Sequence, residues 1–473
     1  MIAPISDSLR ARVDWWFAGD IIGPIRRFAG AMVVVAGPWL VSIAALALIS
    51  LFMEPVMGRT AVEDLRLTVI YAFCVAPLTA GPLGAIAGRT LTEAAASHSG
   101  ATPFGTYLAA SALSTCIAII AGSVVALALG ISPELATAFV FLCGAASQLW
   151  ISFSILTAIR RQGTLVAAFL AGMTGSLAAV LAMAQGTPST PVLIWTFSAG
   201  ILLCCCISGL RIRRDNGRAD ADLVQETRTL LAEIRQSRVM AIGVFLTICG
   251  IWVDKWIFWL GPDAVRSTAG FLHYPPYDSV MFIAHLTAVP AYTAFFLFHD
   301  GLLTCNMKAY RSRLVDGSTY RALKQAKADF VGRIWRGVFT IVFFQAAFTA
   351  SAVLIAPMLT AAFDLDFDQI LILRTGLMAI FFHGVLSMNC AVMLLANRIS
   401  LFCLMQAGLL LLNGGLTAAI YGFMGAGALG FFIAAGVTAV VSFVLAYRAS
   451  TTLDFLIMVG ENDALYRLPR RAV

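Results

Sequence analysis

The chain has 473 residues, of which 60% are hydrophobic and only 12% are charged. Soluble domains usually carry about 25% charged residues, so this composition excludes an ordinary water-soluble enzyme and indicates an integral membrane protein. The formal net charge is +7, and because the basic residues lie between apolar stretches, this charge reflects membrane topology and does not argue for nucleic-acid binding.

Twelve apolar stretches are each long enough to cross a hydrocarbon layer of about 30 Å as a helix, which takes about 20 residues. They are too long and too uniformly apolar for the alternating strands of roughly ten residues that build a membrane barrel. Since backbone groups in lipid must pair internally, helices are expected. The predicted spans are residues 31–52, 67–88, 104–130, 134–157, 164–184, 191–210, 239–260, 277–298, 337–362, 369–393, 399–421 and 424–447.

The beginning of the chain combines an interfacial segment with kinked spans. Residues 1–30 mix aromatic side chains with arginines, a combination typical of a helix at the membrane surface. Gly37-Pro38 and Gly81-Pro82 fall inside the first two spans. Such pairs predict kinks and are hinge candidates, although glycine and proline are also common in membrane helices that do not bend.

Basic residues occupy every second gap between the spans. Of the 32 lysines and arginines, 27 fall in alternate gaps and the termini, four fall in the opposite gaps (Arg59, Arg66, Arg266 and Arg374), and Lys255 lies inside a span. Because cytoplasmic loops carry the excess of positive charge, this bias predicts twelve spans with both termini in the cytoplasm.

The spans divide evenly around a basic linker at 211–238. Six spans precede it in a predicted bundle at 31–210, and six follow in a second at 239–447, which contains a basic loop at 299–336 and leads to a tail at 448–473. Transporters often place the substrate path between two such halves. The sequence contains no nucleotide-binding loop, metal-binding constellation or catalytic arrangement, so we expect neither a cofactor nor an enzyme.

The seventh span carries ionisable residues beyond its midpoint, at Asp254 and Lys255. Charges at that depth cost several kcal/mol unless they meet a partner or water, and neighbouring helical residues do not face each other. Trp252, Trp256 and Trp259 share one helical face. Aromatic rings beside a carboxylate suit a sugar; an aromatic belt with a structural ion pair is the alternative.

The eighth and tenth spans add further candidates for the substrate path. Tyr274 and Asp278 lie at the outer mouth of the eighth span, and His285 lies two turns deeper. Pro290 is expected to interrupt this helix near its middle, as in the broken helices of transport sites. His285 and His383, in the tenth span, are alternatively packing residues.

Several segments resemble one known family. They are IWVDKWIFWLGP (251–262), YDSVMFIAHLTAVPAYTAFF (277–296), AGPWLVSI (36–43) and WISFSILTAIRR (150–161). In these segments the chain resembles the PelG family of Pel exopolysaccharide transporters, which belongs to the flippase superfamily of polysaccharide and multidrug exporters. The resemblance implies two six-helix bundles around a central cavity.

The same resemblance implies a function and partners. The expected function is export of an amino-sugar-rich polymer from cytoplasm to periplasm across the bacterial inner membrane, as a contribution to the biofilm matrix. The implied partners are a cytoplasmic glycosyltransferase of the PelF type and membrane synthase subunits of the PelD and PelE types, for which the loops at 211–238 and 299–336 are the expected docking sites. Alternatives are a lipid-linked oligosaccharide flippase, a cation-coupled drug exporter, and a scaffold of the synthase that transports nothing.

Overall fold

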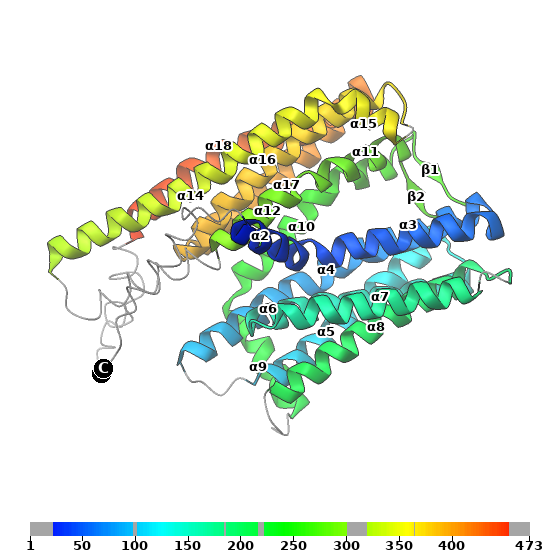
Figure 1. The fold of residues 1–473 in the computed structure, drawn as a ribbon, viewed down its shortest axis with the longest axis horizontal. Coiled ribbons are helices and arrows are strands. Elements are labelled where there is room, and N and C mark those ends of the chain that lie inside the picture. Colours follow the sequence, from blue (N-terminus) through cyan, green and yellow to red (C-terminus); the bar gives the residue numbers. More distant parts are fainter. Residues whose placement is uncertain are drawn as a thin grey trace, which may run out of the picture.

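A computed structural model describes residues 22–97, 102–183, 186–215, 222–299, 319–363 and 365–453. Nearly all of these residues are helical (Figure 1). The expectations for residues 1–21, for 216–221 and 300–318 of the two basic loops, and for 454–473 of the tail fall outside the described residues. The helices are α2 (Ile22–Val35), α3 (Gly37–Met57), α4 (Arg59–Ser97), α5 (Pro103–Leu129), α6 (Pro133–Ala158), α7 (Gln162–Met183), α8 (Thr190–Asp215), α9 (Leu223–Gln236), α10 (Arg238–Trp259), α11 (Pro275–Leu286), α12 (Val289–Leu297), α14 (Tyr320–Leu354), α15 (Ala356–Ala362), α16 (Gln369–Leu395), α17 (Ile399–Met424) and α18 (Leu429–Thr451).

Twelve helical segments of the described chain, with α11 and α12 taken together, are long and apolar enough to cross a membrane. The predicted class, an all-α polytopic membrane protein with twelve spans, is therefore confirmed. A single short antiparallel pair, β1 (Val265–Arg266) with β2 (Leu272–His273), is the only sheet among the described residues.

The spans form two bundles, which lie above and below each other in Figure 1. In the lower bundle α4 packs against α5 and α6, and α8 packs against α6 and α7. In the upper bundle α16 packs against α11, α14 and α18, and α17 packs against α10 and α18. Contacts between α4 and α10, and between α2 and α12, join the two bundles.

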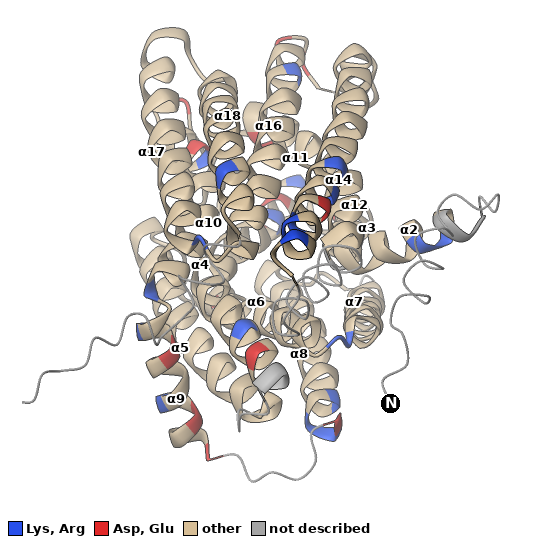
Figure 2. Cartoon of the chain, turned by 90° about the vertical axis from the view of Figure 1, so that its left-hand side faces the viewer, with Lys and Arg blue, Asp and Glu red and all other residues tan. Residues whose placement is uncertain are grey.

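The two ends of the molecule differ. The end that carries β1 and β2, together with the α3–α4 connection, is called the hairpin end below and lies on the right in Figure 1. The opposite end carries α9 and the first turns of α14 and is called the basic end. Figure 2, which views this end, shows lysine and arginine on the ends of α8, α9 and α14.

Three segments differ from the sequence prediction. The first span does not begin at residue 31, because the chain breaks at Ala36 and α3 begins at Gly37 with Pro38 in its first turn, where a proline costs no hydrogen bond. Gly81 and Pro82 lie inside the uninterrupted α4. The ninth span begins earlier than residue 337, since α14 starts at Tyr320 and makes the second part of the predicted basic loop helical.

The eighth span is interrupted as Pro290 predicts. α11 ends at Leu286 and α12 begins at Val289, with Pro290 in its first turn. The Gln345 amide donates a hydrogen bond of 3.0 Å to the Thr287 carbonyl at this break, so a neighbouring helix satisfies a backbone group that the interruption releases. Use of the break as a hinge stays a prediction.

Glycine sets the closest helix contact in the lower bundle. α7 and α8 cross where Gly172 meets Gly200, and a Cβ atom on Gly200 would lie only 2.6 Å from the Gly172 carbonyl oxygen and 2.7 Å from Ser176 Cβ. Small residues allow such backbone approach, which supplies the packing that drives helix association in lipid.

We predict that Gly172→Ala destabilises the lower bundle. The new methyl group would clash with the Gly200 backbone, and overpacking of this kind costs about 1–3 kcal/mol. Gly175→Ala is the matched control on the same helix, because a Cβ there would lie 3.9 Å from its nearest neighbour. Thermal unfolding of the purified protein measures the difference, and equal melting temperatures for the two variants would refute the tight crossing.

Candidate functional site

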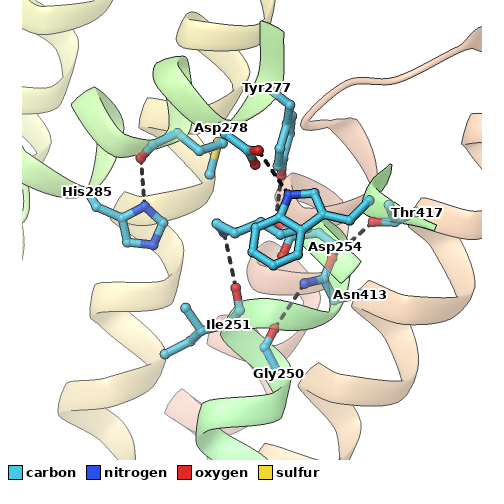
Figure 3. A network of polar contacts seen from close by, with 11 residues as sticks. Gly250, Ile251, Asp254, Tyr277, Asp278, His285, Asn413 and Thr417 are labelled. Atoms are coloured by element: carbon cyan, nitrogen blue, oxygen red, sulfur yellow. Dashed lines mark hydrogen bonds and ion pairs between the residues drawn. The ribbon is translucent and has the colours of Figure 1, made fainter. Parts of the chain in front are cut away.

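A buried carboxylate lies at the centre of the intramembrane polar network (Figure 3). Asp254 of α10 is 0% exposed and accepts a hydrogen bond from the Tyr277 hydroxyl of α11. The Lys255 ammonium lies 3.5 Å from the same Asp254 oxygen, Oδ2, and donates to the Ile251 carbonyl at 3.2 Å. Both charged groups therefore have a second partner, as their adjacent positions on one helix require.

A second carboxylate fixes the start of α11. Asp278 Oδ2 accepts hydrogen bonds from Trp259 Nε1 at 2.9 Å and from the Tyr274 backbone N–H at 3.0 Å. Asp278 is in the first turn of α11, where a negative charge complements the helix dipole. Among the described residues, Asp254 Oδ1 and Asp278 Oδ1 are both buried without a hydrogen-bond partner. The Lys255 ammonium pairs with Asp254, and each of the two carboxylates keeps one acceptor oxygen without a partner.

The tryptophans of α10 lie at the boundary between the two bundles. Trp259 is buried and stacks on Tyr71 of α4 with ring centroids 4.8 Å apart. Trp252 meets Trp259 edge-on at 6.0 Å, and the Lys255 ammonium lies 5.7 Å from the Trp252 ring centroid. Trp252 and Trp256 are only partly buried and pack against the core of the lower bundle. The predicted aromatic face therefore exists, and it crosses from one bundle to the other.

The two histidines lie in the upper bundle with partners of their own. His285 Nδ1 is 2.7 Å from the Met281 carbonyl oxygen of its own helix. His383 Nδ1 is 3.3 Å from the Tyr292 hydroxyl. Neither ring is hydrogen-bonded to Asp254 or Lys255, so the contacts of both fit the packing interpretation more directly than the path interpretation.

Sequence reasoning missed two contributors to the network. Tyr277, the partner of Asp254, is fully buried, and its position beside Asp278 in a motif already singled out was the available signal. Asn413 of α17 donates to the Gly250 carbonyl at 3.0 Å and accepts from Thr417 at 3.0 Å. Nothing in the local sequence distinguishes this asparagine, because its role comes from the packing of α17 on α10.

The segment between α10 and α11, residues 260–274, is called the outer hairpin. It follows a helix of the upper bundle but is fixed to the lower bundle. Asp64 of α4 accepts hydrogen bonds from the Thr268 hydroxyl and, at 3.0 Å, from the Ala269 backbone N–H. The Tyr71 hydroxyl donates to the Leu272 carbonyl at 2.6 Å, and Arg266 donates to the Leu129 carbonyl at 2.5 Å.

The packing of the outer hairpin agrees with these hydrogen bonds. Phe271 is 0% exposed and inserts between Tyr71 and Phe139, at ring centroid distances of 4.9 and 5.7 Å. Gly270 forms the turn at φ +98°, a conformation that favours glycine. The hairpin therefore joins the bundles at this end of the molecule.

A buried histidine lies at the end of the hairpin. His273 is buried, and its Nε2 lies 3.4 Å from the Glu63 carboxylate. Burial lowers the pKa of His273 below its ordinary value, while Glu63 and Asp64 act in the opposite direction with smaller effect.

Within the described residues, no group of three or more His, Cys, Asp and Glu side chains could hold a metal ion.

Comparison with known proteins gives one family and one fold. The family model "PelG: Putative exopolysaccharide Exporter (EPS-E)" matches residues 18–457. Among solved structures, a MATE in the bent conformation has a TM-score of 0.60 at 15% identity, covering 92% of this chain and 97% of its own. A MATE in complex with MaD3S has a TM-score of 0.58 at 14% identity, covering 90% and 96%. No curated protein matches.

An outward-facing multidrug resistance MATE family transporter of the MOP superfamily is also similar, with a TM-score of 0.57 at 15% identity over 91% of this chain and 96% of that chain. MATE transporters have twelve helices in two bundles, so these likenesses confirm the predicted arrangement of the fold.

We predict that Asp64→Asn loosens the outer hairpin. The change removes the charge from a group that accepts two hydrogen bonds from the hairpin, and bonds to charged groups contribute about 1.5–3 kcal/mol each. Amide hydrogen exchange at residues 265–273 should become faster, whereas Glu134→Gln, which alters an exposed carboxylate near the same end, should leave it unchanged. Unaltered exchange in Asp64→Asn would contradict the assigned contact.

We also predict that acid weakens the docking of the outer hairpin on the lower bundle. Because the pKa of His273 is lowered in the docked state, a proton binds more tightly after undocking. The contribution of His273 to the free energy of docking is complete at a pH above the ordinary histidine pKa of about 6.5. It is lost as the pH falls below that value. Exchange of residues 265–273, corrected for the intrinsic rate, should rise between about pH 7.5 and 5.5. His273→Gln should abolish this dependence; an unchanged profile would disprove it.

Proposed function

Because the chain belongs to the PelG family, we propose that it exports an amino-sugar-rich exopolysaccharide of the Pel type from the cytoplasm to the periplasm for the biofilm matrix. The family and the MATE-like fold establish a membrane transporter. The polymer, the direction of transport and the bacterial inner membrane as location are the proposed parts. The alternating basic gaps support an orientation with the basic end and both termini in the cytoplasm.

The observation that carries the proposal is the pair of unused carboxylate oxygens inside the membrane. Asp254 and Asp278 each keep one buried oxygen without a hydrogen-bond partner among the described residues, and Lys255 is ion-paired with Asp254. An unsatisfied buried acceptor costs about 1–3 kcal/mol, and intramembrane ionisable groups usually mark a substrate or ion path. A polymer that carries ammonium and hydroxyl groups supplies the donors that these oxygens lack.

The partly buried surfaces beside the carboxylates suit sugar rings. Trp252 and Trp256 are partly accessible at the boundary between the bundles, and the Lys255 side chain is 11% exposed. Flat apolar faces of sugar rings pack well on indole. We propose that a polymer passing along a central cavity between the bundles contacts these tryptophans, with Tyr274, His285 and His383 along the same path.

Asp254 itself is closed off by Tyr277 in this conformation. We propose that an amino group of the polymer replaces the Tyr277 hydroxyl as donor, and that α11 then moves about its interruption before Pro290. Gly37-Pro38 at the start of α3, and Gly81-Pro82 inside α4, are the corresponding hinge candidates in the lower bundle.

The basic end is the proposed docking site for the synthase. α9 and the first turns of α14 present exposed lysines and arginines there (Figure 2). These helices belong to the 211–238 and 299–336 segments, and partners of the PelF, PelD and PelE types would deliver the polymer to this end.

Three experiments separate the alternatives. A lipid-linked oligosaccharide flippase predicts that a lipid-linked intermediate accumulates when the gene is deleted, whereas a polymer exporter predicts none. A scaffold predicts that reconstituted vesicles pass no sugar under any gradient. A cation-coupled drug exporter predicts drug efflux that does not depend on the polymer.

We predict that Asp254→Asn lowers polymer export at least about tenfold, because a charge-assisted contact worth about 1.5–3 kcal/mol is lost. Asparagine keeps the volume and can still accept from Tyr277, so membrane insertion should be normal. Secreted polymer per cell, normalised to protein in the membrane, is the measurement. Glu134→Gln is the control for an exposed carboxylate. Export at the unmodified level from a well-expressed Asp254→Asn protein would rule out the charge requirement.

A further inference from the structure

A groove between α7 and α8 lies far from the polar network, at the basic end of the lower bundle. Its volume is about 520 Å³. The α7 wall consists of small residues, and the α8 wall changes from apolar side chains to arginine toward the basic end. The lining includes Gly163, Thr164 and Ala167 of α7 and Leu210, Arg211 and Arg214 of α8.

The groove follows from the way the two helices cross. α7 and α8 touch at Gly172 and Gly200, where their backbones are in contact. The helices are farther apart toward the basic end, and a Cβ atom on Gly163 would meet nothing within 4 Å. From Gly172 to Gly163 the helix advances roughly 14 Å, at 1.5 Å per residue. This length matches about half of a hydrocarbon layer of about 30 Å, which is one leaflet.

The groove faces outward, not toward the other bundle. Leu170 of α7 and Leu203 and Leu210 of α8 are exposed large apolar residues, as expected of side chains that contact lipid. The polar network, by contrast, lies on α10 and α11. A ligand in this groove therefore enters from the membrane and not from the polymer path.

Positive charge gathers at the open end of the groove. Asp215 pairs with Arg161 at 2.7 Å and with Arg211 at 3.2 Å, so one carboxylate is shared by two guanidinium groups. Arg214 has no ion pair in the part of the chain that the structure describes. The rim therefore keeps a net positive charge at the level where phospholipid headgroups lie.

We propose that this groove binds one anionic phospholipid, with its phosphate on Arg211 and Arg214 and one acyl chain between α7 and α8. Guanidinium groups bind phosphate in a bidentate manner, and basic pockets between membrane helices on the cytoplasmic side suit anionic headgroups. A zwitterionic lipid is disfavoured, because its ammonium group would approach the same arginines. The site does not depend on the proposed polymer.

The test is native mass spectrometry of the purified full chain with added phosphatidylglycerol or phosphatidylcholine of identical acyl chains. We expect phosphatidylglycerol to bind at least about tenfold more tightly, the effect of one charge-assisted contact. The double variant Arg211→Gln/Arg214→Gln should lose this preference. Arg336→Gln removes an exposed arginine of α14 that donates a hydrogen bond to the Gly332 carbonyl of its own helix, and should keep the preference.

A second variant tests the groove without changing charge. Ala167→Phe places a ring in the space for the acyl chain, at an exposed position where folding is not at risk, and should also lower the affinity. Glycerol phosphate, which lacks acyl chains, should not compete. Any one of four outcomes would overturn the proposal. These are equal binding of the two lipids, an equal loss of the phosphatidylglycerol preference in Arg336→Gln, full binding by Ala167→Phe, and competition by glycerol phosphate.

Discussion

The structure depends on the cost of keeping a carboxylate in a membrane interior. Asp254 has no access to water, so its charge is compensated by the Tyr277 hydroxyl and the Lys255 ammonium. Removing one partner of a buried ion pair costs about 3–5 kcal/mol, because the other charge is left uncompensated. The Asp254–Lys255 pair lies within α10, so it is the hydrogen bond from Tyr277 that fixes α11 against α10. Asp278 then fixes Trp259 at the next level along the same helices.

α10 contacts both bundles. Its carboxylate side is bonded within the upper bundle, whereas its tryptophans pack on the core of the lower bundle. The outer hairpin continues this contact beyond the membrane end of α10, where Asp64 and Tyr71 of α4 hold it. The charged network and the contact between the bundles therefore involve two faces of one helix. A displacement of α10 that alters one of them also alters the other.

Most of the fold could be predicted from the pattern of hydrophobic residues, because each span must be apolar over the thickness of a membrane. The depth of Asp254 and the break before Pro290 could be predicted for the same reason: ions and prolines conflict with a helix in lipid. The early start of α14 could not, since its first turns lie in a polar segment that hydropathy does not distinguish from a loop. The roles of Tyr277 and Asn413 and the contact of Asp64 with the hairpin could not be predicted either, because they depend on contacts between segments that are distant in the sequence.

The energies of these contacts suggest an order in which they would break during the proposed transport. The hairpin contacts are separate hydrogen bonds near the end of the molecule, each worth about 0.5–3 kcal/mol, and can break one at a time. The contact between Asp254 and Tyr277 cannot break alone, because the carboxylate would remain buried without its donor. Under the proposed function, a cargo amine that takes the place of the hydroxyl would remove this cost. In that proposal, movement of α11 is favoured when cargo is present and opposed when it is absent, so the buried charge would link opening of the path to its occupancy.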